Sequence, residues 1–229
     1  MTLCAPDFYP RAWYGAPIDD FLTAQPDAVL GQLATNSDFS VDPTQRNAWV
    51  AEVAILKDSL AGFSGTVLLE FNIPRMGQRI DAVLLIGPIV FVVEFKVGAI
   101  AFDRTAIEQV WDYALDLKNF HAASHSVPIV PTLVATEARK ALRLDLYKDD
   151  DNLYRPALLN KDSLAVFIAA STKTIRGATI DGSNWASAPY KPTPTIVEAA
   201  RALYASHSVE AIARFDAGST NLRVTSRRV

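Results

Sequence analysis

Hydrophobic and polar positions in the central part of the chain follow a helical pattern first. Apolar residues recur every three or four positions after Asp42-Pro43, an aspartate cap and a first-turn proline that favour a helix start. We expect a helix from there to about Gly62, with one carboxylate, Glu52, on its inward-facing stripe. The apolar members of this stripe are Trp49, Val53, Leu56 and Leu60.

The pattern then changes to that of strands. Gly65 to Ile73 predicts a first strand by its alternation. Arg79 to Gly98 reads RIDAVLLIGPIVFVVEFKVG, which predicts two buried strands joined by a turn at Gly87-Pro88. In the first strand, one face is expected to carry Leu69, Phe71 and Ile73, and the other Thr66, Leu68, Glu70 and Asn72.

Three ionisable side chains interrupt the apolar hairpin: Asp81, Glu94 and Lys96. Charged groups are costly to bury unless they pair or hold a metal. Alternation places Glu94 and Lys96 on one face with Phe95 on the other, and hairpin pairing would set Asp81 beside Glu94. The sequence therefore predicts that two carboxylates and an ammonium converge at one point on the sheet.

A second helix and a further buried strand follow. Asp103 can cap a helix through about Ala123, and Ser126 to Ala135 predicts the strand. Gln109 and Tyr113, four residues apart, share one face of this helix. Its buried stripe is expected to be Ile107, Val110, Ala114, Leu117 and His121.

The sequence predicts that the chain has three parts. These are a helical lead-in at 1–40, a core domain at 41–175, and a linker with a helical connector at 176–229. The lead-in has helix-like pieces at Asp19 to Leu22 and Ala28 to Leu33. The later elements are expected to be a helix at Glu137 to Leu146, a strand at Tyr154 to Leu159, a helix at Asp162 to Ser171, a loop at Ile175 to Pro192, and helices at Thr193 to Ala205 and His207 to Phe215.

Composition favours a globular protein. Of 229 residues, 50% are hydrophobic and 21% charged, and no apolar run is long enough to span a bilayer as a helix. The N-terminus lacks the pattern of a signal peptide, and the single cysteine, Cys4, fits a reducing compartment, so we expect a cytoplasmic protein. Because the net charge is −3, binding of nucleic acid would require a local positive patch, a metal ion or another domain.

Ile80-Asp81 followed by Glu94-Phe95-Lys96 resembles the motif of the PD-(D/E)XK nuclease superfamily. The predicted order of helix, three strands, helix and strand is similar to the core of that superfamily. The resemblance implies an α/β fold with a restriction-endonuclease-like core, in which an antiparallel three-stranded meander lies in a mixed central sheet with helical extensions. Glu52 on the first helix and the Gln109-x-x-x-Tyr113 pattern on the second resemble features of the RecB-like members.

A second resemblance covers most of the chain. The phrases WVAEVAILKDSL and IPRMGQRIDAVLL, and PTPTIVEAARALYASHSVEAIARFDAG followed by NLRVTS, look similar to prokaryotic proteins that join such a nuclease-like domain to a superfamily 1 helicase. It implies a helicase domain as a partner, in cis or in trans. The phosphate-binding pattern G-x-x-x-x-G-K-[ST] of such a motor does not occur in the sequence.

The resemblance implies a nuclease that uses Mg²⁺ or Mn²⁺ to hydrolyse DNA. Asp81 and Glu94, with Glu52, would hold the metal, and Lys96 would assist the attacking water. The alternative is a catalytically inactive, nuclease-like module that binds nucleic acid or docks a partner. A small-molecule enzyme of another α/β class is a third possibility, for which the sequence offers no dinucleotide loop and no metal-spaced Cys/His set.

Several candidate residues keep two interpretations. Glu52 is either a paired glutamate at the edge of the helical stripe or a metal or water ligand. Glu70 is either a solvated outer-face residue or a further acid near the site. Arg75 and Arg79 either contact phosphates or are ordinary surface arginines, and Gln109 and Tyr113 either assist the site or pack. Packing or capping is expected for His121 and His125, and a solvated loop for Asp149-Asp150-Asp151.

Overall fold

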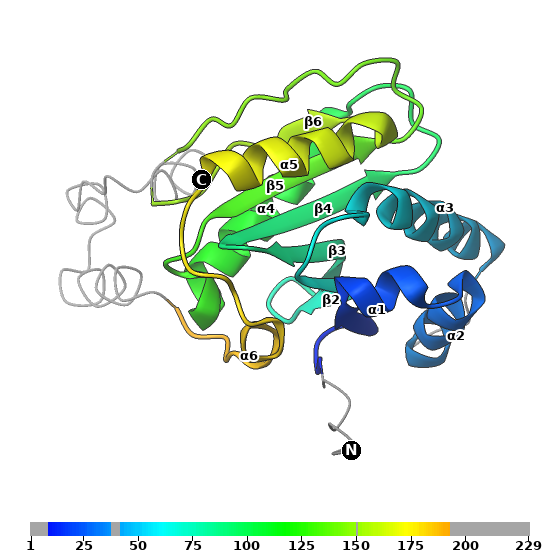
Figure 1. Cartoon of the computed structure of the whole chain (residues 1–229), viewed down its shortest axis with the longest axis horizontal. Helices are drawn as coiled ribbons and strands as arrows, with labels where there is room; N and C mark the ends of the chain where they lie inside the picture. Colours follow the sequence, from blue (N-terminus) through cyan, green and yellow to red (C-terminus); the bar gives the residue numbers. More distant parts are fainter. Residues whose placement is uncertain (1–8, 38–41, 150, 193–229) are drawn as a thin grey trace, which may run out of the picture.

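A six-stranded mixed sheet forms the centre of the molecule (Figure 1). The computed structural model describes residues 9–37, 42–149 and 151–192. The first four strands pair antiparallel, whereas β5 and β6 continue the sheet in parallel with β4, as a mixed α/β sheet requires. In spatial order the strands are β1 (Tyr14–Pro17), β2 (Thr66–Ile73), β3 (Gln78–Ile86), β4 (Ile89–Lys96), β5 (Ile129–Ala135) and β6 (Ala157–Leu159).

Helices cover both faces of this sheet, so the fold has three layers. One face packs against α1 (Ile18–Thr23), α2 (Pro26–Asn36), α3 (Pro43–Leu60) and α5 (Leu164–Thr174). The other packs against α4 (Arg104–Phe120) and α6 (Gly182–Ser187). Two short 3₁₀ turns lie at Ala122–Ser124 and Lys161–Ser163. No helix in the described part of the chain is both long and apolar enough to cross a membrane.

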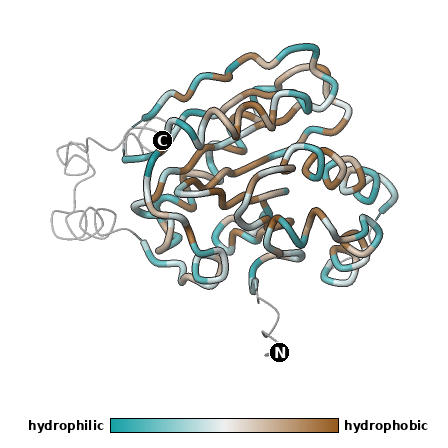
Figure 2. Tube along the Cα trace, viewed as in Figure 1, coloured by the Kyte–Doolittle hydropathy of each residue, from teal (hydrophilic) through white to brown (hydrophobic). Residues whose placement is uncertain are grey.

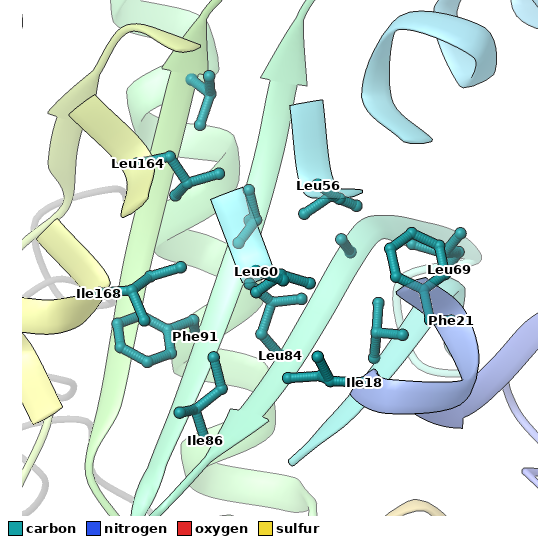
Figure 3. Close-up of a cluster of buried hydrophobic side chains, with 14 of the residues drawn as sticks. Ile18, Phe21, Leu56, Leu60, Leu69, Leu84, Ile86, Phe91, Leu164 and Ile168 are labelled. Carbon is teal, nitrogen blue, oxygen red and sulfur yellow. The ribbon is translucent and has the colours of Figure 1, made fainter. Parts of the chain in front are cut away.

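The hydrophobic residues gather where these layers meet. Figure 2 shows apolar segments along the inner strands and polar ones along the outer loops. In the larger core, Leu56 and Leu60 of α3 and Ile168 of α5 lie over Leu84 and Phe91 of the central strands (Figure 3). Each of these five side chains is at most 2% exposed, and such a side chain contributes about 1.5–3 kcal/mol through burial.

The two helices that carry candidate residues begin as the sequence predicted. The Asp42 carboxylate accepts hydrogen bonds from the backbone N–H groups of Thr44 and Gln45, at 2.7 and 3.0 Å. Asp103 accepts from the N–H of Thr105 at 3.1 Å. These caps satisfy free N–H groups of the first turn and fix where α3 and α4 start. The positions of Glu52, Gln109 and Tyr113 along the helices follow from these starts.

The alternation of β2 is interrupted at Glu70, so one prediction was wrong. Leu69 packs on the face covered by α3, whereas Phe71 and Ile73 pack on the face covered by α4. Glu70 has a φ of 51°, in the left-handed region, which shifts the side chains that follow it to the opposite face. The side chains of the neighbouring strand β3 change face at the matching position. Ile80 packs on the face covered by α4, and Ala82 packs on the face covered by α3.

Other differences from the predicted elements lie outside this centre. Residues 137–146 are not helical, because Leu142 and Arg143 hydrogen-bond to Leu158 at the edge of β6. The loop expected at 175–192 contains α6, whose buried Trp185 packs 5.2 Å from the Phe71 ring. The lead-in supplies β1, which the sequence did not predict, besides the two expected helices. Cys4, Asp150, the helices expected at 193–205 and 207–215, and the NLRVTS segment lie outside the described residues.

Gly65, just before β2, offers a test of this packing. Its φ is 148°, and a Cβ there would lie 2.0 Å from the carbonyl oxygen of Leu85 in β3. Gly65→Ala is expected to lower the free energy of unfolding by about 2–3 kcal/mol, because the backbone must move. Gly31→Ala in α2, where the new Cβ meets nothing within 4 Å, is expected to raise it by about 0.5–1 kcal/mol. Urea denaturation compares both with the parent, and an unchanged Gly65→Ala midpoint would contradict this close approach.

Candidate active site

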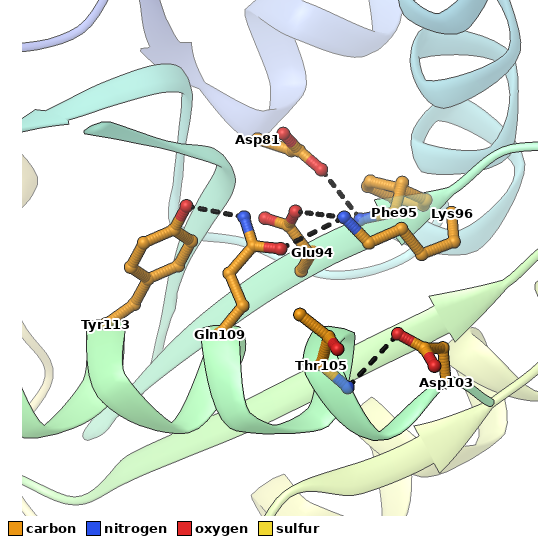
Figure 4. Close-up of polar contacts among 8 residues, drawn as sticks. All are labelled: Asp81, Glu94, Phe95, Lys96, Asp103, Thr105, Gln109 and Tyr113. Carbon is orange, nitrogen blue, oxygen red and sulfur yellow. Dashed lines mark hydrogen bonds and ion pairs between the residues drawn. The ribbon is translucent and has the colours of Figure 1, made fainter.

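The three ionisable residues of the β3–β4 hairpin meet at its open end (Figure 4). Pairing between the strands stops at Ala82 and Val93, so Asp81 and Glu94 lie where the strands separate. Asp81 Oδ2 accepts a hydrogen bond from the backbone N–H of Phe95 at 2.7 Å. Lys96 Nζ donates to Glu94 Oε1 at 2.9 Å, and Asp81, Glu94 and Lys96 all line one cavity. The predicted convergence is therefore present.

Helix α4 extends this cluster with two polar side chains. Lys96 Nζ also donates to Gln109 Oε1 at 3.1 Å, and Gln109 Nε2 donates to the Tyr113 hydroxyl at 2.7 Å. A continuous series of hydrogen bonds thus joins Glu94, Lys96, Gln109 and Tyr113, as Figure 4 shows. Gln109 and Tyr113 are one helical turn apart and therefore lie on the same face of α4. Both belong to the hydrogen-bonded series that begins at the end of β4.

These groups line a cavity of about 500 Å³. Its walls include four carboxylates, from Glu52, Glu70, Asp81 and Glu94. The Lys96 side chain is 37% exposed, whereas that of Glu94 is 4% exposed. A molecule entering the cavity would therefore meet the Lys96 ammonium at its mouth and the Glu94 carboxylate deeper inside.

Burial and mutual repulsion keep the carboxyls of Glu52, Asp81 and Glu94 from ionising easily. Burial raises the pKa of Asp81 well above its usual range, and the negative charges of Glu94 and Glu52 raise it further. Burial, then repulsion from Glu70 and Glu94, raises the pKa of Glu52 to about 8. Burial also raises the pKa of Glu94, against the opposing effect of the Lys96 ammonium. The cluster therefore favours a bound proton or cation at neutral pH.

Glu70 lies in the same cavity, but its oxygens are already engaged. Oε1 accepts from the indole N–H of Trp49 at 2.7 Å, and Oε2 accepts from Arg79 Nε at 2.8 Å. Glu70 is only 8% exposed, so the interpretation as a solvated outer-face residue was wrong. The Arg79 guanidinium in turn lies 3.9 Å from the centre of the Trp13 ring. These contacts join β2, β3 and α3 and hold the left-handed backbone of Glu70 in place.

Glu70→Ala is expected to lower the free energy of unfolding by about 2–4 kcal/mol, because Trp49 and Arg79 would lose their buried acceptor. Glu137→Ala, which removes an ion pair with Lys161 whose side chains are 43% and 54% exposed, is the matched control. We expect it to change stability by less than about 1 kcal/mol. Chemical denaturation measures both, and similar losses in the two variants would show that the buried contacts of Glu70 contribute little.

Arg75 is not part of the cavity wall. Its Nε binds Asp116 at 3.1 Å, and its guanidinium lies 3.6 Å from the centre of the Phe120 ring, near the end of α4. His121 does not line the cavity either. It is fully buried, and its Nδ1 lies 2.8 Å from the Ser124 hydroxyl. This arrangement is the packing or capping role that the sequence predicted for His121.

Sequence reasoning missed the residues of α3 that face the same opening as Glu52. Thr44 and Ala48 line a cavity together with Glu52, and Trp49 binds Glu70. The signal was the spacing of four residues between Thr44, Ala48 and Glu52, which puts them on one helical face. It was weak because threonine and alanine carry no distinctive chemistry.

The carboxylates fit a hard divalent cation to a limited extent. Glu94 Oε2 is buried and has no hydrogen-bond partner among the described residues. Mg²⁺ needs only one or two protein carboxylates, since it keeps several waters. Asp81 and Glu94 provide such a pair. Within the described ranges, however, no three His, Cys, Asp or Glu side chains form a group that could hold a metal, so Glu52 is not a third ligand as it lies.

Comparison of this chain with known proteins identifies no relative. No family model, no curated protein and no solved structure matches it.

Proposed function

We propose that this chain is a metal-dependent nuclease domain of the PD-(D/E)XK type, with a restriction-endonuclease-like core, that hydrolyses DNA phosphodiester bonds. The observation that carries the proposal is the convergence of Asp81, Glu94 and Lys96 where β3 and β4 separate. Two carboxylates and an ammonium that line one polar cavity suit a phosphodiester, whose hydrolysis needs both a cation and a positioned donor.

Each residue has a role in this proposal. Asp81 and Glu94 would hold Mg²⁺ or Mn²⁺, which when bound polarises the phosphodiester and lowers the pKa of water. The Lys96 ammonium, fixed by Glu94 and Gln109, orients the attacking water or neutralises charge that develops on the phosphorus oxygens. Burial raises the pKa of Tyr113 to about 12, so its hydroxyl keeps its proton at neutral pH and supports Gln109.

The second candidate is an inactive module that binds nucleic acid or docks a partner. Lys96 and Arg79 are the basic residues of the cavity wall, and both already pair with glutamates. With a net charge of −3, the domain has little excess positive charge to hold DNA unaided. This favours a role for a partner, and the resemblance suggests a helicase, in cis or in trans.

The experiment that tests the function is cleavage of end-labelled DNA. Single-stranded, duplex, linear and circular substrates are each incubated with Mg²⁺, Mn²⁺ or EDTA. Cutting that requires the metal supports the nuclease, and the circular substrates show whether a free end is needed. Absence of cutting on every substrate, together with no metal binding by calorimetry, would favour the docking module instead.

A further inference from the structure

A second cavity, of about 760 Å³, adjoins the candidate active site. The two cavities share wall residues, among them Glu52, Phe95, Lys96 and Gln109. The remaining walls come from the first turns of α3 and α4 and from the segment 97–103 between β4 and α4. A strand whose phosphodiester lies at Lys96 would therefore extend directly into this second cavity.

The second cavity is poorly suited to phosphate groups. Lys96 is the one basic residue on its described walls, where Glu52 and Asp103 are also present. The Asp103 carboxylate accepts from the N–H of Thr105 in the first turn of α4, and Asp42 accepts from the first turn of α3, so a negative charge already offsets the positive field of each helix start. Duplex DNA carries about one negative charge per 1.7 Å and would find no matching charge here.

The walls instead offer apolar surface with a few neutral hydrogen-bonding groups. Val97 lines the cavity and is 43% exposed, and Ile100, between the wall residues Ala99 and Ala101, is 78% exposed. Asn47 and Thr105 supply amide and hydroxyl groups on the two helical walls. Such a surface matches a nucleobase and its sugar, which present flat apolar faces and polar edges without charge.

We infer that the second cavity binds the base and sugar of an unpaired DNA strand next to the scissile phosphate, so that the substrate is single-stranded DNA. This inference rests on the proposed nuclease function. The bases of an intact duplex are stacked and paired, and reaching the cavity would require unstacking that costs a few kcal/mol. Val97 and Ile100 would then determine strand preference and take no part in the bond cleavage.

The test combines a side-chain deletion with a base deletion. Val97→Ala/Ile100→Ala, in the segment that lines the second cavity, is compared with the parent and with Val166→Ala, a 67% exposed aliphatic residue of α5, a helix that lines neither cavity. Two quantities are measured: cleavage of single-stranded and blunt duplex DNA, and anisotropy of a fluorescent oligonucleotide in EDTA. A single abasic position is then moved along the oligonucleotide.

We expect the parent to prefer the single strand at least about tenfold, and the double variant to bind it about three- to tenfold more weakly. The best-placed abasic position should weaken oligonucleotide binding by the parent but not by the double variant. Equal cutting of blunt duplex, or binding unaffected by the double variant, would overturn the inference and leave the nuclease standing. No cutting of any substrate would overturn the nuclease, and absence of oligonucleotide binding would then overturn the cavity assignment as well.

Discussion

Asp81→Asn is expected to reduce metal-dependent DNA cleavage by at least about a hundredfold, the usual effect of removing a metal ligand or charge-stabilising group. The amide keeps the size of the side chain and can still accept from the N–H of Phe95, so the hairpin should remain folded. It removes the negative charge that the pair of Asp81 and Glu94 offers to a cation. Initial cleavage rates over a range of Mg²⁺ concentrations measure the loss.

Asp116→Asn is the matched control for this variant. Asp116 is 7% exposed, burial raises its pKa, and it pairs with Arg75, but it lines neither cavity. We expect its cleavage rate to stay within about threefold of the parent, because neither Asp116 nor its partner Arg75 lines either cavity. An Asp81→Asn protein that is folded by circular dichroism and still cuts at the parental rate would contradict the proposed role of Asp81.

The central elements could be predicted because their sequences leave few alternatives. The stripe of α3 has a helical period, whereas the apolar runs of β3 and β4 are short, rich in β-branched residues and separated by Gly87-Pro88, as is typical of buried strands. β1 could not be predicted, because its four residues, YGAP, show no alternation and depend on pairing with β2. The helix expected at Glu137 to Leu146 failed for the same reason, as this segment pairs with β6 instead.

The convergence of Asp81, Glu94 and Lys96 could be predicted because charges inside apolar strands must meet a partner. The environment of Glu70 could not, since it depends on Trp49 from another element and on a left-handed backbone that no local pattern announces. The position of Arg75 outside the cavity wall could likewise not be predicted, because it depends on an ion pair with Asp116, 41 residues further along the chain. Contacts between distant segments thus determine which of the candidate residues reach the cavity.

The carboxylate cluster should make stability depend on pH in an unusual direction. The pKa of Glu52 rises from an ordinary value of 4.5 to about 8 in the folded protein, so the folded state holds a proton that the unfolded chain has lost. The stabilisation is therefore complete below about pH 4.5 and is lost as the pH rises through 8. For Glu52 alone this loss is on the order of 5 kcal/mol.

His121 sets the lower limit of the useful pH range. Burial lowers its pKa from 6.5 to about 3, so its contribution is present above pH 6.5 and is lost as the pH falls towards 3. Measurements between pH 6.5 and 9 therefore report on the carboxylates with little contribution from His121. In this range the parent is expected to lose stability steadily, and Glu52→Gln is expected to lose much less.

A divalent cation should oppose this loss, because it would replace protons between Asp81 and Glu94. At pH 8.5 we expect saturating Mg²⁺ or Mn²⁺ to stabilise the parent by about 2–3 kcal/mol over EDTA, and at pH 5 by almost nothing. Asp81→Asn should abolish the effect of the metal, and Asp116→Asn should leave it intact. Thermal denaturation with each metal across the pH range measures these differences. If the Tm of the parent changes neither with pH above 6.5 nor with metal, these carboxylates form no cation site. If the metal still raises the Tm of Asp81→Asn, the cation binds elsewhere.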